Sequence, residues 1–244
     1  MAGHNKWSKI KNKKGKEDAK RGKEFTKLSR AIMVAAKTGG ENPDYNAALK
    51  TAIDKAKAIN MPNDNINRAI KKGTSDADVA NYEEVTYEGY GPSGIAVIVE
   101  CLTDNRNRTA PDVRHAFDKY HGNLGTNGSV SFLFDYLGLI LVNNSKYDAE
   151  EVMMEVLDAD IVDVKNEGDY IEIYTSKDNF HATKEFLTGK GYEIEESEIM
   201  YIPKNYQTLS NPEDIKFMEK LIDVLEENDD VQNVYHNWET PDEE

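Results

Sequence analysis

The sequence predicts a multidomain α+β protein that begins with a three-helix domain. Apolar residues recur every three or four positions between residues 17 and 70, the period of a helix, and form short alternating runs typical of strands from about residue 80. The elements between residues 137 and 199 follow the order βαββαβ, that of the ferredoxin-like split motif. The flanking segments repeat this order, so we expect two ferredoxin-like α+β domains, one inserted in the other. A length of 244 residues suits up to three small domains.

The first domain, residues 1–75, is predicted to hold a basic arm and three helices. The first helix is expected from Glu17 to Lys37, ended by the glycines at 39 and 40. A second is expected from about Asp44 to Asn60, and a short third follows the MetProAsn segment and ends at Gly73. The predicted inward face of the first helix is Phe25, Leu28, Ala31, Ile32 and Ala35.

The second domain is predicted to be discontinuous, with residues 80–136 and 200–240. Its helices are expected from Thr109 to about Tyr120, where Thr109 and Asp112 have capping-box spacing, and from Pro212 to Glu227. Its predicted strands are YEEVTYEGY, GIAVIVECL, SVSFLFDY, the end of EIEESEIMYIP, and VQNVYHN.

The inserted domain is predicted to span residues 137–199. Its helices are expected at Ala149–Leu157 and Asn179–Thr188. Its predicted strands are LGLILVN, DIVDV, DYIEIYT and YEIEESEIMYIP.

Positive charge is concentrated at the start of an acidic protein. Residues 1–72 hold 18 Lys and Arg against 7 Asp and Glu, a net charge of +11. The other 172 residues hold 12 against 38, a net charge of −26, so the whole chain carries −15. An asymmetry of this size indicates that the basic part has a polyanionic partner such as nucleic acid.

Six cations form a stripe along the first predicted helix, because their spacings of 3, 4, 3, 4 and 3 keep them on one face. The alternative is a solvated helix face, but the acidity of the remaining chain favours contact with nucleic acid. If all six met phosphates of a single nucleic-acid strand, a plot of log binding constant against log salt concentration would have a slope of about −4. The stripe consists of Lys13, Lys16, Lys20, Lys23, Lys27 and Arg30.

The arm before the helix continues the positive charge with Lys6, Lys9 and Lys14. Trp7 lies among these lysines, where its ring could stack on an unpaired base. Alternatively, Trp7 and Ile10 pack on the helical domain, and the sequence leaves both possibilities open.

A second candidate surface is the TDNRNRT segment, where Arg106 and Arg108 are expected just ahead of a helix N-terminus. Two guanidinium groups beside free backbone N–H groups could bind a phosphate or an acidic protein loop. Alternatively, the arginines pair with nearby acids while the Asp and Asn side chains form local turn bonds. The glycines of HGNLGTNGS are expected to supply turns with positive φ.

The sequence lacks the marks of several function classes. It has no GxxxxGK(S/T) and no GxGxxG after a strand, and its five His and one Cys have no zinc-ligand spacing. We therefore expect no catalytic residues, no metal, no cofactor and no small-molecule substrate. Cys101 lies in a strand-like apolar run and is expected to be a core residue. No apolar run matches a membrane span or a signal peptide, so we expect no membrane association and a cytoplasmic location.

Four long segments are recognisable together: AGHNKWSKIKNKKGKEDAKRGKEF, NMPNDNINRAIKKG, YEGYGPSGIAVIVECLTDNRNRTAPDVRHAF and HGNLGTNGSVSFLFD. They resemble the YebC/PmpR family, which is related to a mitochondrial translational activator of cytochrome c oxidase, and the similarity runs through nearly the whole chain. The resemblance implies a helical domain followed by two α+β domains, and a non-enzymatic regulator. It supports Lys6, Trp7, Lys9, Lys13, Lys16 and the TDNRNRT segment as functional surface without assigning chemistry to them.

We expect a nucleic-acid-binding regulator of gene expression. The family's label, probable transcriptional regulator, implies DNA as the partner. A competing view makes family members ribosome-associated factors that help translation through proline-rich stretches, with ribosomal or transfer RNA and ribosomal proteins as partners. A Lys-rich arm with one tryptophan suits RNA, and no groove-reading helix is evident. An enzyme would need a pocket with converging polar groups, which the sequence does not indicate.

Overall fold

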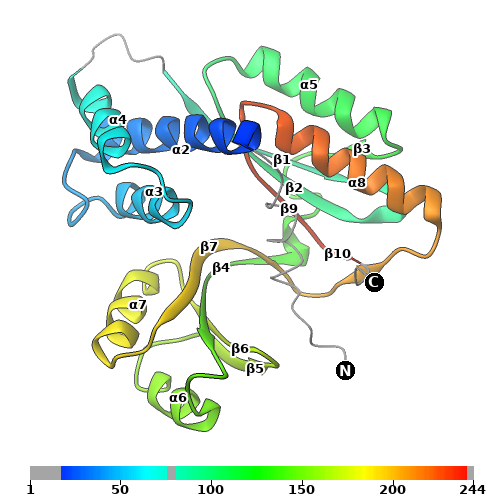
Figure 1. Cartoon of the computed structure of the whole chain (residues 1–244). Coiled ribbons are helices and arrows are strands. Elements are labelled where there is room, and N and C mark those ends of the chain that lie inside the picture. Colours follow the sequence, from blue (N-terminus) through cyan, green and yellow to red (C-terminus); the bar gives the residue numbers. More distant parts are fainter. Residues whose placement is uncertain (1–17, 76–80, 241–244) are drawn as a thin grey trace. The chain divides into compact units, whose positions relative to one another are not determined.

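The computed structural model describes residues 18–75 and 81–240, with side chains from residue 22 onward. The chain divides into two compact units (Figure 1). One unit combines the described residues up to 131 with residues 209–238, and the other holds residues 132–208 together with residues 239–240. The predicted α+β class, with N-terminal helices and a ferredoxin-like domain, is confirmed.

Three helices form the N-terminal part of the first unit, as predicted. Helix α2 ends where Gly40 takes φ +87°, a left-handed conformation that glycine adopts without strain, and the Gly40 amide donates to the Ala36 carbonyl at 2.9 Å. The helices are α2 (Asp18–Gly39), α3 (Ala47–Ala58) and α4 (Asn63–Ser75).

The buried side chain of Asn46 joins the end of α2 to the start of α3. Its amide nitrogen donates to the carbonyls of Ala35 and Gly40, each at 2.8 Å, and its oxygen accepts from the amide of Leu49 at 3.1 Å. One side chain thereby caps the N-terminus of α3 and satisfies a carbonyl of the last turn of α2. The short segment between the two helices is thus held at both ends.

The core of the three helices consists of aliphatic residues at the predicted spacing. Of the five predicted inward residues of α2, only Ile32 is fully buried. The other four are partly buried and pack against the core. Gly73 lets α4 approach α2 closely, because a Cβ there would overlap the Met33 carbonyl. The buried set is Ile32, Ala36, Leu49, Ala52, Ile53, Ala56, Met61, Ile66 and Ala69.

The rest of the first unit is a four-stranded sheet covered on one face by two helices. The strand order is β3-β1-β2-β9, and every pairing is antiparallel. Helices α5 and α8 lie side by side over the sheet (Figure 1), and their apolar faces share one core with β2. The elements are β1 (Glu83–Tyr90), a 3₁₀ turn at Pro92–Gly94, β2 (Ala96–Thr103), α5 (Arg106–Lys119), β3 (Asn123–Leu124), α8 (Pro212–Glu227) and β9 (Val231–His236).

The start of α5 differs from the prediction. The helix begins at Arg106, and the Asn105 side chain caps it by accepting from the Arg108 amide at 3.2 Å. The predicted capping box of Thr109 and Asp112 is therefore wrong. Asn105 is as strong an N-cap as Thr, and its earlier position lets Thr109 be fully buried inside the helix.

The glycine-rich loop after β3 is held by a buried acid. Glu88 is only 7% exposed, and its carboxylate accepts from the amides of Gly128, Val130 and Ser131, each at 2.8 Å. Burial alone raises the pKa of this carboxyl, but the backbone hydrogen bonds outweigh burial and leave the pKa below its ordinary value. Of the three loop glycines, only Gly128 has positive φ.

The second unit has the ferredoxin-like order, with strands β5-β6-β4-β7 all antiparallel. Its two helices pack their apolar faces on the sheet around Ile140, Ile171 and Ile173. Two further strands of two residues each, β8 (Gln207–Thr208) and β10 (Trp238–Glu239), pair with each other. The elements of the βαββαβ motif are β4 (Phe134–Asn143), α6 (Ala149–Val156), β5 (Asp163–Glu167), β6 (Tyr170–Thr175), α7 (Phe180–Gly189) and β7 (Ile194–Pro203).

Two predicted strands, SVSFLFDY and LGLILVN, are in fact one. A 3₁₀ turn occupies Ser131–Leu133, and β4 then runs without a break through the LeuGly that suggested a boundary. Gly138 is part of this strand, and a glycine is needed there because a Cβ would overlap the side chains of Thr175 and Phe180. The assignment of SVSFLFDY and of the end of EIEESEIMYIP to the sheet of the first unit is therefore wrong, and β1 and β3 complete that sheet instead. The predicted domain boundaries at 136 and 199 fall inside β4 and β7.

Candidate nucleic-acid interface

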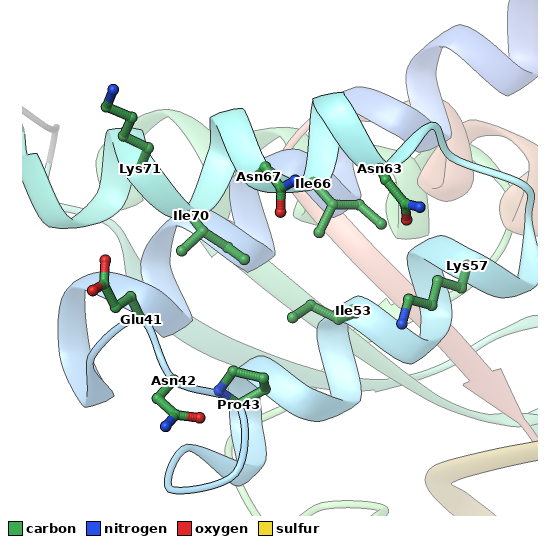
Figure 2. Close-up of a pocket in the computed structure, with 10 residues that line it drawn as sticks. All are labelled: Glu41, Asn42, Pro43, Ile53, Lys57, Asn63, Ile66, Asn67, Ile70 and Lys71. Carbon is green, nitrogen blue, oxygen red and sulfur yellow. The ribbon is translucent and has the colours of Figure 1, made fainter.

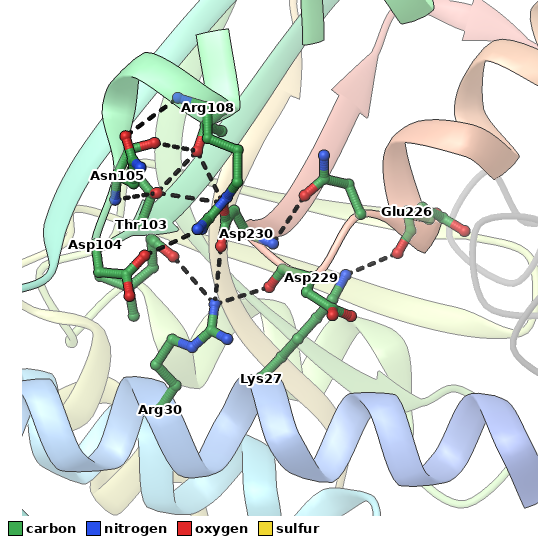
Figure 3. Close-up of polar contacts among 12 residues, drawn as sticks. Lys27, Arg30, Thr103, Asp104, Asn105, Arg108, Glu226, Asp229 and Asp230 are labelled. Carbon is green, nitrogen blue, oxygen red and sulfur yellow. Dashed lines mark hydrogen bonds and ion pairs between the residues drawn. The ribbon is translucent and has the colours of Figure 1, made fainter. Parts of the chain in front are cut away.

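Two arginines predicted as separate candidate surfaces meet at one carboxylate (Figure 3). Asp230 precedes β9, and its side chain is 7% exposed. It accepts from Arg30 on α2 at 3.2 Å and from Arg108 on α5 at 2.7 Å. The hydroxyls of Thr103 and Thr109 donate to the same carboxylate at 3.2 and 2.8 Å. A buried carboxylate is stable only when it is paired and hydrogen-bonded in this way.

These contacts also set the charge state of Asp230. Burial raises the pKa of its carboxyl, but the hydrogen bonds from Arg108 and Thr109 and the charge of Arg108 outweigh burial. The net pKa lies below the ordinary aspartate value. Asp230 is therefore ionised at neutral pH and binds both guanidinium groups as a full charge.

The cations of α2 also bind the C-terminal end of α8. Lys27 donates to the Glu226 carbonyl at 2.7 Å, and Lys23 lies 3.5 Å from the Glu227 carbonyl. The last four carbonyls of a helix have no partner within the helix, and cations are favourable near them. The last turn of α8 contains no basic residue of its own, so α2 supplies the cations from outside.

Lys27 is half-buried at this contact. Burial lowers the pKa of its ammonium group, and the nearby charges of Glu226 and Asp229 partly oppose that shift. A lowered pKa is expected for an amine that packs against protein rather than extending into water.

The three described cations of the predicted stripe face the protein itself. Lys23, Lys27 and Arg30 face α8 and β9, where they bind carbonyls or a carboxylate. The side chain of Lys20 lies outside the described residues, as do Lys6, Trp7, Lys9, Lys13, Lys14 and Lys16. Helical periodicity locates a row of cations on one face, but it carries no information about which distant segment covers that face.

The two arginines of TDNRNRT occupy the first turn of α5 rather than the chain ahead of it. Arg108 pairs with Asp104 at 3.0 Å as well as with Asp230. Arg106 keeps 60% of its side chain exposed, and its nearest carboxylate oxygen, on Glu83, is 4.0 Å away. Both arginine side chains are at least half exposed, but Arg108 is bound by two close carboxylates, so Arg106 is the less tightly paired of the two.

A groove that the sequence did not indicate opens on the helical domain (Figure 2). Its volume is about 810 Å³, and it lies between α3, α4 and the segment that joins α2 to α3. Aliphatic side chains alternate along it with amides and charges. The lining residues are Glu41, Asn42, Pro43, Ile53, Lys57, Asn63, Ile66, Asn67, Ile70 and Lys71.

The described part of the chain contains neither a cluster of metal-ligand side chains nor a membrane-spanning helix. In residues 18–75 and 81–240, no three His, Cys, Asp or Glu side chains cluster closely enough to hold a metal ion. No helix within those ranges is long and apolar enough to cross a membrane. Cys101 is buried, as predicted, and burial raises the pKa of its thiol to about 12, so the reactive thiolate is scarce.

Two family models together match nearly all of the chain. The TACO1/YebC protein N-terminal domain matches residues 5–76, and the TACO1/YebC second and third domain matches residues 82–238. The chain belongs to the TACO1/YebC family. The resemblance seen in the sequence is thereby confirmed.

Individual relatives agree with this assignment over their full lengths. A protein of Finegoldia magna is 58% identical over 98% of this chain and 99% of its own length, and one of Acetivibrio thermocellus is 54% identical over the same shares. Both are called probable transcriptional regulatory protein. The crystal structure of a conserved hypothetical protein from Aquifex aeolicus superposes with a TM-score of 0.79, at 44% identity over 93% of each chain.

Proposed function

We propose that this TACO1/YebC family member is a non-enzymatic regulator of gene expression that acts by binding nucleic acid through its N-terminal part. The observation that carries the proposal is the segregation of charge, with +11 in residues 1–72 and −26 in the remainder. A polyanion is attracted to one part and repelled by the other, so binding is oriented. The name carried by the relatives, probable transcriptional regulatory protein, favours duplex DNA and transcription as the setting.

The contacts of α2 restrict which cations bind phosphate. If Lys23, Lys27 and Arg30 stay on α8 and Asp230, half of the six-residue stripe is occupied. If a single strand binds through the remaining three cations of the stripe, a plot of log binding constant against log salt concentration has a slope of about −2. If the three bound cations are released and all six meet phosphates, the slope is about −4. A titration between low and moderate salt distinguishes these two cases.

A second candidate function is that of a translation factor bound to ribosomal or transfer RNA. The groove between α3 and α4 favours it, because amides and lysines around an apolar floor suit unpaired bases better than a closed duplex. The acidic α+β part would suit docking against basic ribosomal proteins.

Ultraviolet crosslinking in the protein's own cells, with sequencing of both the RNA and the DNA recovered, tests the two candidates. Enriched promoter DNA without RNA supports the transcriptional regulator. Ribosomal or transfer RNA joined to the N-terminal part supports the translation factor and makes a transcriptional effect indirect. Recovery of neither nucleic acid above a control lacking the protein would contradict both.

A further inference from the structure

The groove of the helical domain is open to solvent and has a volume comparable to that of ligand sites. Its volume of about 810 Å³ lies within the range of roughly 300 to 1,000 Å³ that ligand sites occupy. Ile53 and Ile66 form part of its floor and are nearly inaccessible to water, while Ile70 is half-buried beside them. Figure 2 shows the lining side chains of α4 arranged across the groove from those of α3. Because Ile70 is the partly exposed one of the three, it is the apolar surface that the face of a planar base could contact.

The polar groups of the groove suit the edge of a base. Asn63 and Asn67 are one turn apart on α4, both exposed, and their side chains form no hydrogen bond with another residue of the described ranges. An amide offers a donor and an acceptor side by side, which matches the paired groups on base edges. Glu41 adds an acceptor for an exocyclic amine, and its negative charge disfavours a bare phosphate in the same place.

Cations border this groove and remain accessible. Lys57 and Lys71 line it, and Arg68 and Lys72 each follow a lining residue in the sequence of α4. All four are exposed, and their side chains form no hydrogen bond or ion pair with another residue that the structure describes. They differ in this from Lys23, Lys27 and Arg30 on α2, whose charges are already bound. The accessible cations therefore complement phosphates that flank a base in the groove.

An aromatic ring lies on the segment that forms one wall. Tyr45 follows the lining residue Pro43 by two positions, and its amide donates to the Asn42 carbonyl at 3.2 Å. Its side chain is 89% exposed, the highest value among the large hydrophobic side chains of the described residues. An exposed tyrosine beside accessible lysines is a platform on which a base can stack.

We propose that this groove binds an unpaired base of single-stranded RNA, with Tyr45 stacking on a neighbouring base and Lys57 and Lys71 meeting the flanking phosphates. The inference rests on the proposed nucleic-acid function and names its site. RNA is the occupant because proteins recognise its unpaired bases on their open edges, whereas a duplex keeps those edges paired. The groove is independent of the α2 cations that bind α8.

The test measures binding of the full chain to a fluorescently labelled, unstructured 12-nucleotide RNA by anisotropy at low salt. Asn67→Ala and Tyr45→Ala should each weaken binding by about tenfold, the size expected for loss of one base contact. Asn65→Ala is the matched control, because Asn65 is on the same helix but does not line the groove. Lys71→Ala should weaken binding more than Lys72→Ala, although both remove one charge from adjacent positions. Circular dichroism of each variant checks the fold.

The outcomes separate the groove from the general function. If the unaltered protein binds RNA but Asn67→Ala and Asn65→Ala bind equally well, the groove is not the site and the proposed function stands. If the unaltered protein binds neither RNA nor DNA, both proposals fail. If a single-stranded DNA of the same sequence binds as tightly, or a duplex binds through the same residues, RNA is not the preferred occupant and the assignment is overturned. Crosslinking of 4-thiouridine RNA to residues 41–45 and 63–71 would support it directly.

Discussion

Arg30 donates to the carboxylate of Asp230 at 3.2 Å, across 200 positions of sequence. The bond joins the basic helix of the N-terminal part to the loop that precedes β9. Only 17% of the Arg30 side chain and 7% of the Asp230 side chain are exposed, so the pair is shielded from solvent and salt. A residue that the sequence placed on a nucleic-acid-binding stripe thus has a structural partner within its own chain.

Replacing Asp230 by Asn should destabilise the first unit. The substitution keeps the volume of the side chain but removes the charge that Arg30 and Arg108 share. We expect a loss of about 2 to 4 kcal/mol in the free energy of unfolding, since breaking a buried pair costs about 3 to 5 kcal/mol and Arg108 is half-exposed. Urea denaturation measures it, with Asp229→Asn, an exposed neighbour, as the control expected within about 0.5 kcal/mol of the unaltered protein. Equal losses for both variants would contradict the prediction.

Acid should weaken the protein through Asp230 and Glu88. Both carboxyls have pKa values below their ordinary ones in the folded chain. Their stabilisation is therefore complete above the unfolded pKa values of about 4 and is lost as the pH falls through the lower folded values. The urea concentration at the midpoint of unfolding should fall between pH 7 and pH 3. It should fall less for the Asp230→Asn, Glu88→Gln double variant than for the unaltered protein. Equal declines in the two proteins would show that other titrating groups cause the loss of stability in acid.

Replacing Glu88 by Gln should loosen the glycine-rich loop. The carboxylate accepts three amide hydrogen bonds with its two oxygens, whereas an amide side chain has one oxygen and turns a donor toward the remaining N–H. A buried donor without its acceptor costs about 1 to 3 kcal/mol. Hydrogen exchange at the amides of Gly128, Val130 and Ser131 should become about five to 150 times faster, given about 1.4 kcal/mol per tenfold change. Glu84→Gln, an exposed position on the same strand, should leave these rates unchanged.

Replacing Gly73 by Ala should destabilise the three-helix part. Alanine normally favours a helix over glycine by about 1 kcal/mol, but here its Cβ would overlap the Met33 carbonyl and press on Ala36. We expect a net loss of about 1 to 3 kcal/mol, the usual cost of overpacking. Gly22→Ala on α2 is the control with the opposite expected sign, because nothing lies within 4 Å of the Cβ that alanine would add. We expect it to raise the free energy of unfolding by up to about 1 kcal/mol. A gain at both positions in urea denaturation would show that α2 and α4 can move apart without cost.

Local pattern was sufficient for most of the fold. The periodicity and caps of the sequence located α8 at both ends and placed the three N-terminal helices within a few residues of their bounds. Local pattern was less informative at the start of α5, where two cap signals compete. It also failed at Gly138, which interrupts an apolar pattern without ending the strand. Both errors arose where a single residue has two local interpretations and packing chooses between them.

The candidate site depended far more on tertiary structure. Sequence alone determined the helical domain, the βαββαβ order, the family and the concentration of positive charge at the N-terminus, because each is encoded in the identity and spacing of nearby residues. Only the tertiary structure decided that Lys27 and Arg30 face α8 and Asp230, and that Lys57 and Lys71 border an open groove. Spacing along a helix specifies which residues share a face, whereas the environment of that face is set by segments up to 204 positions away.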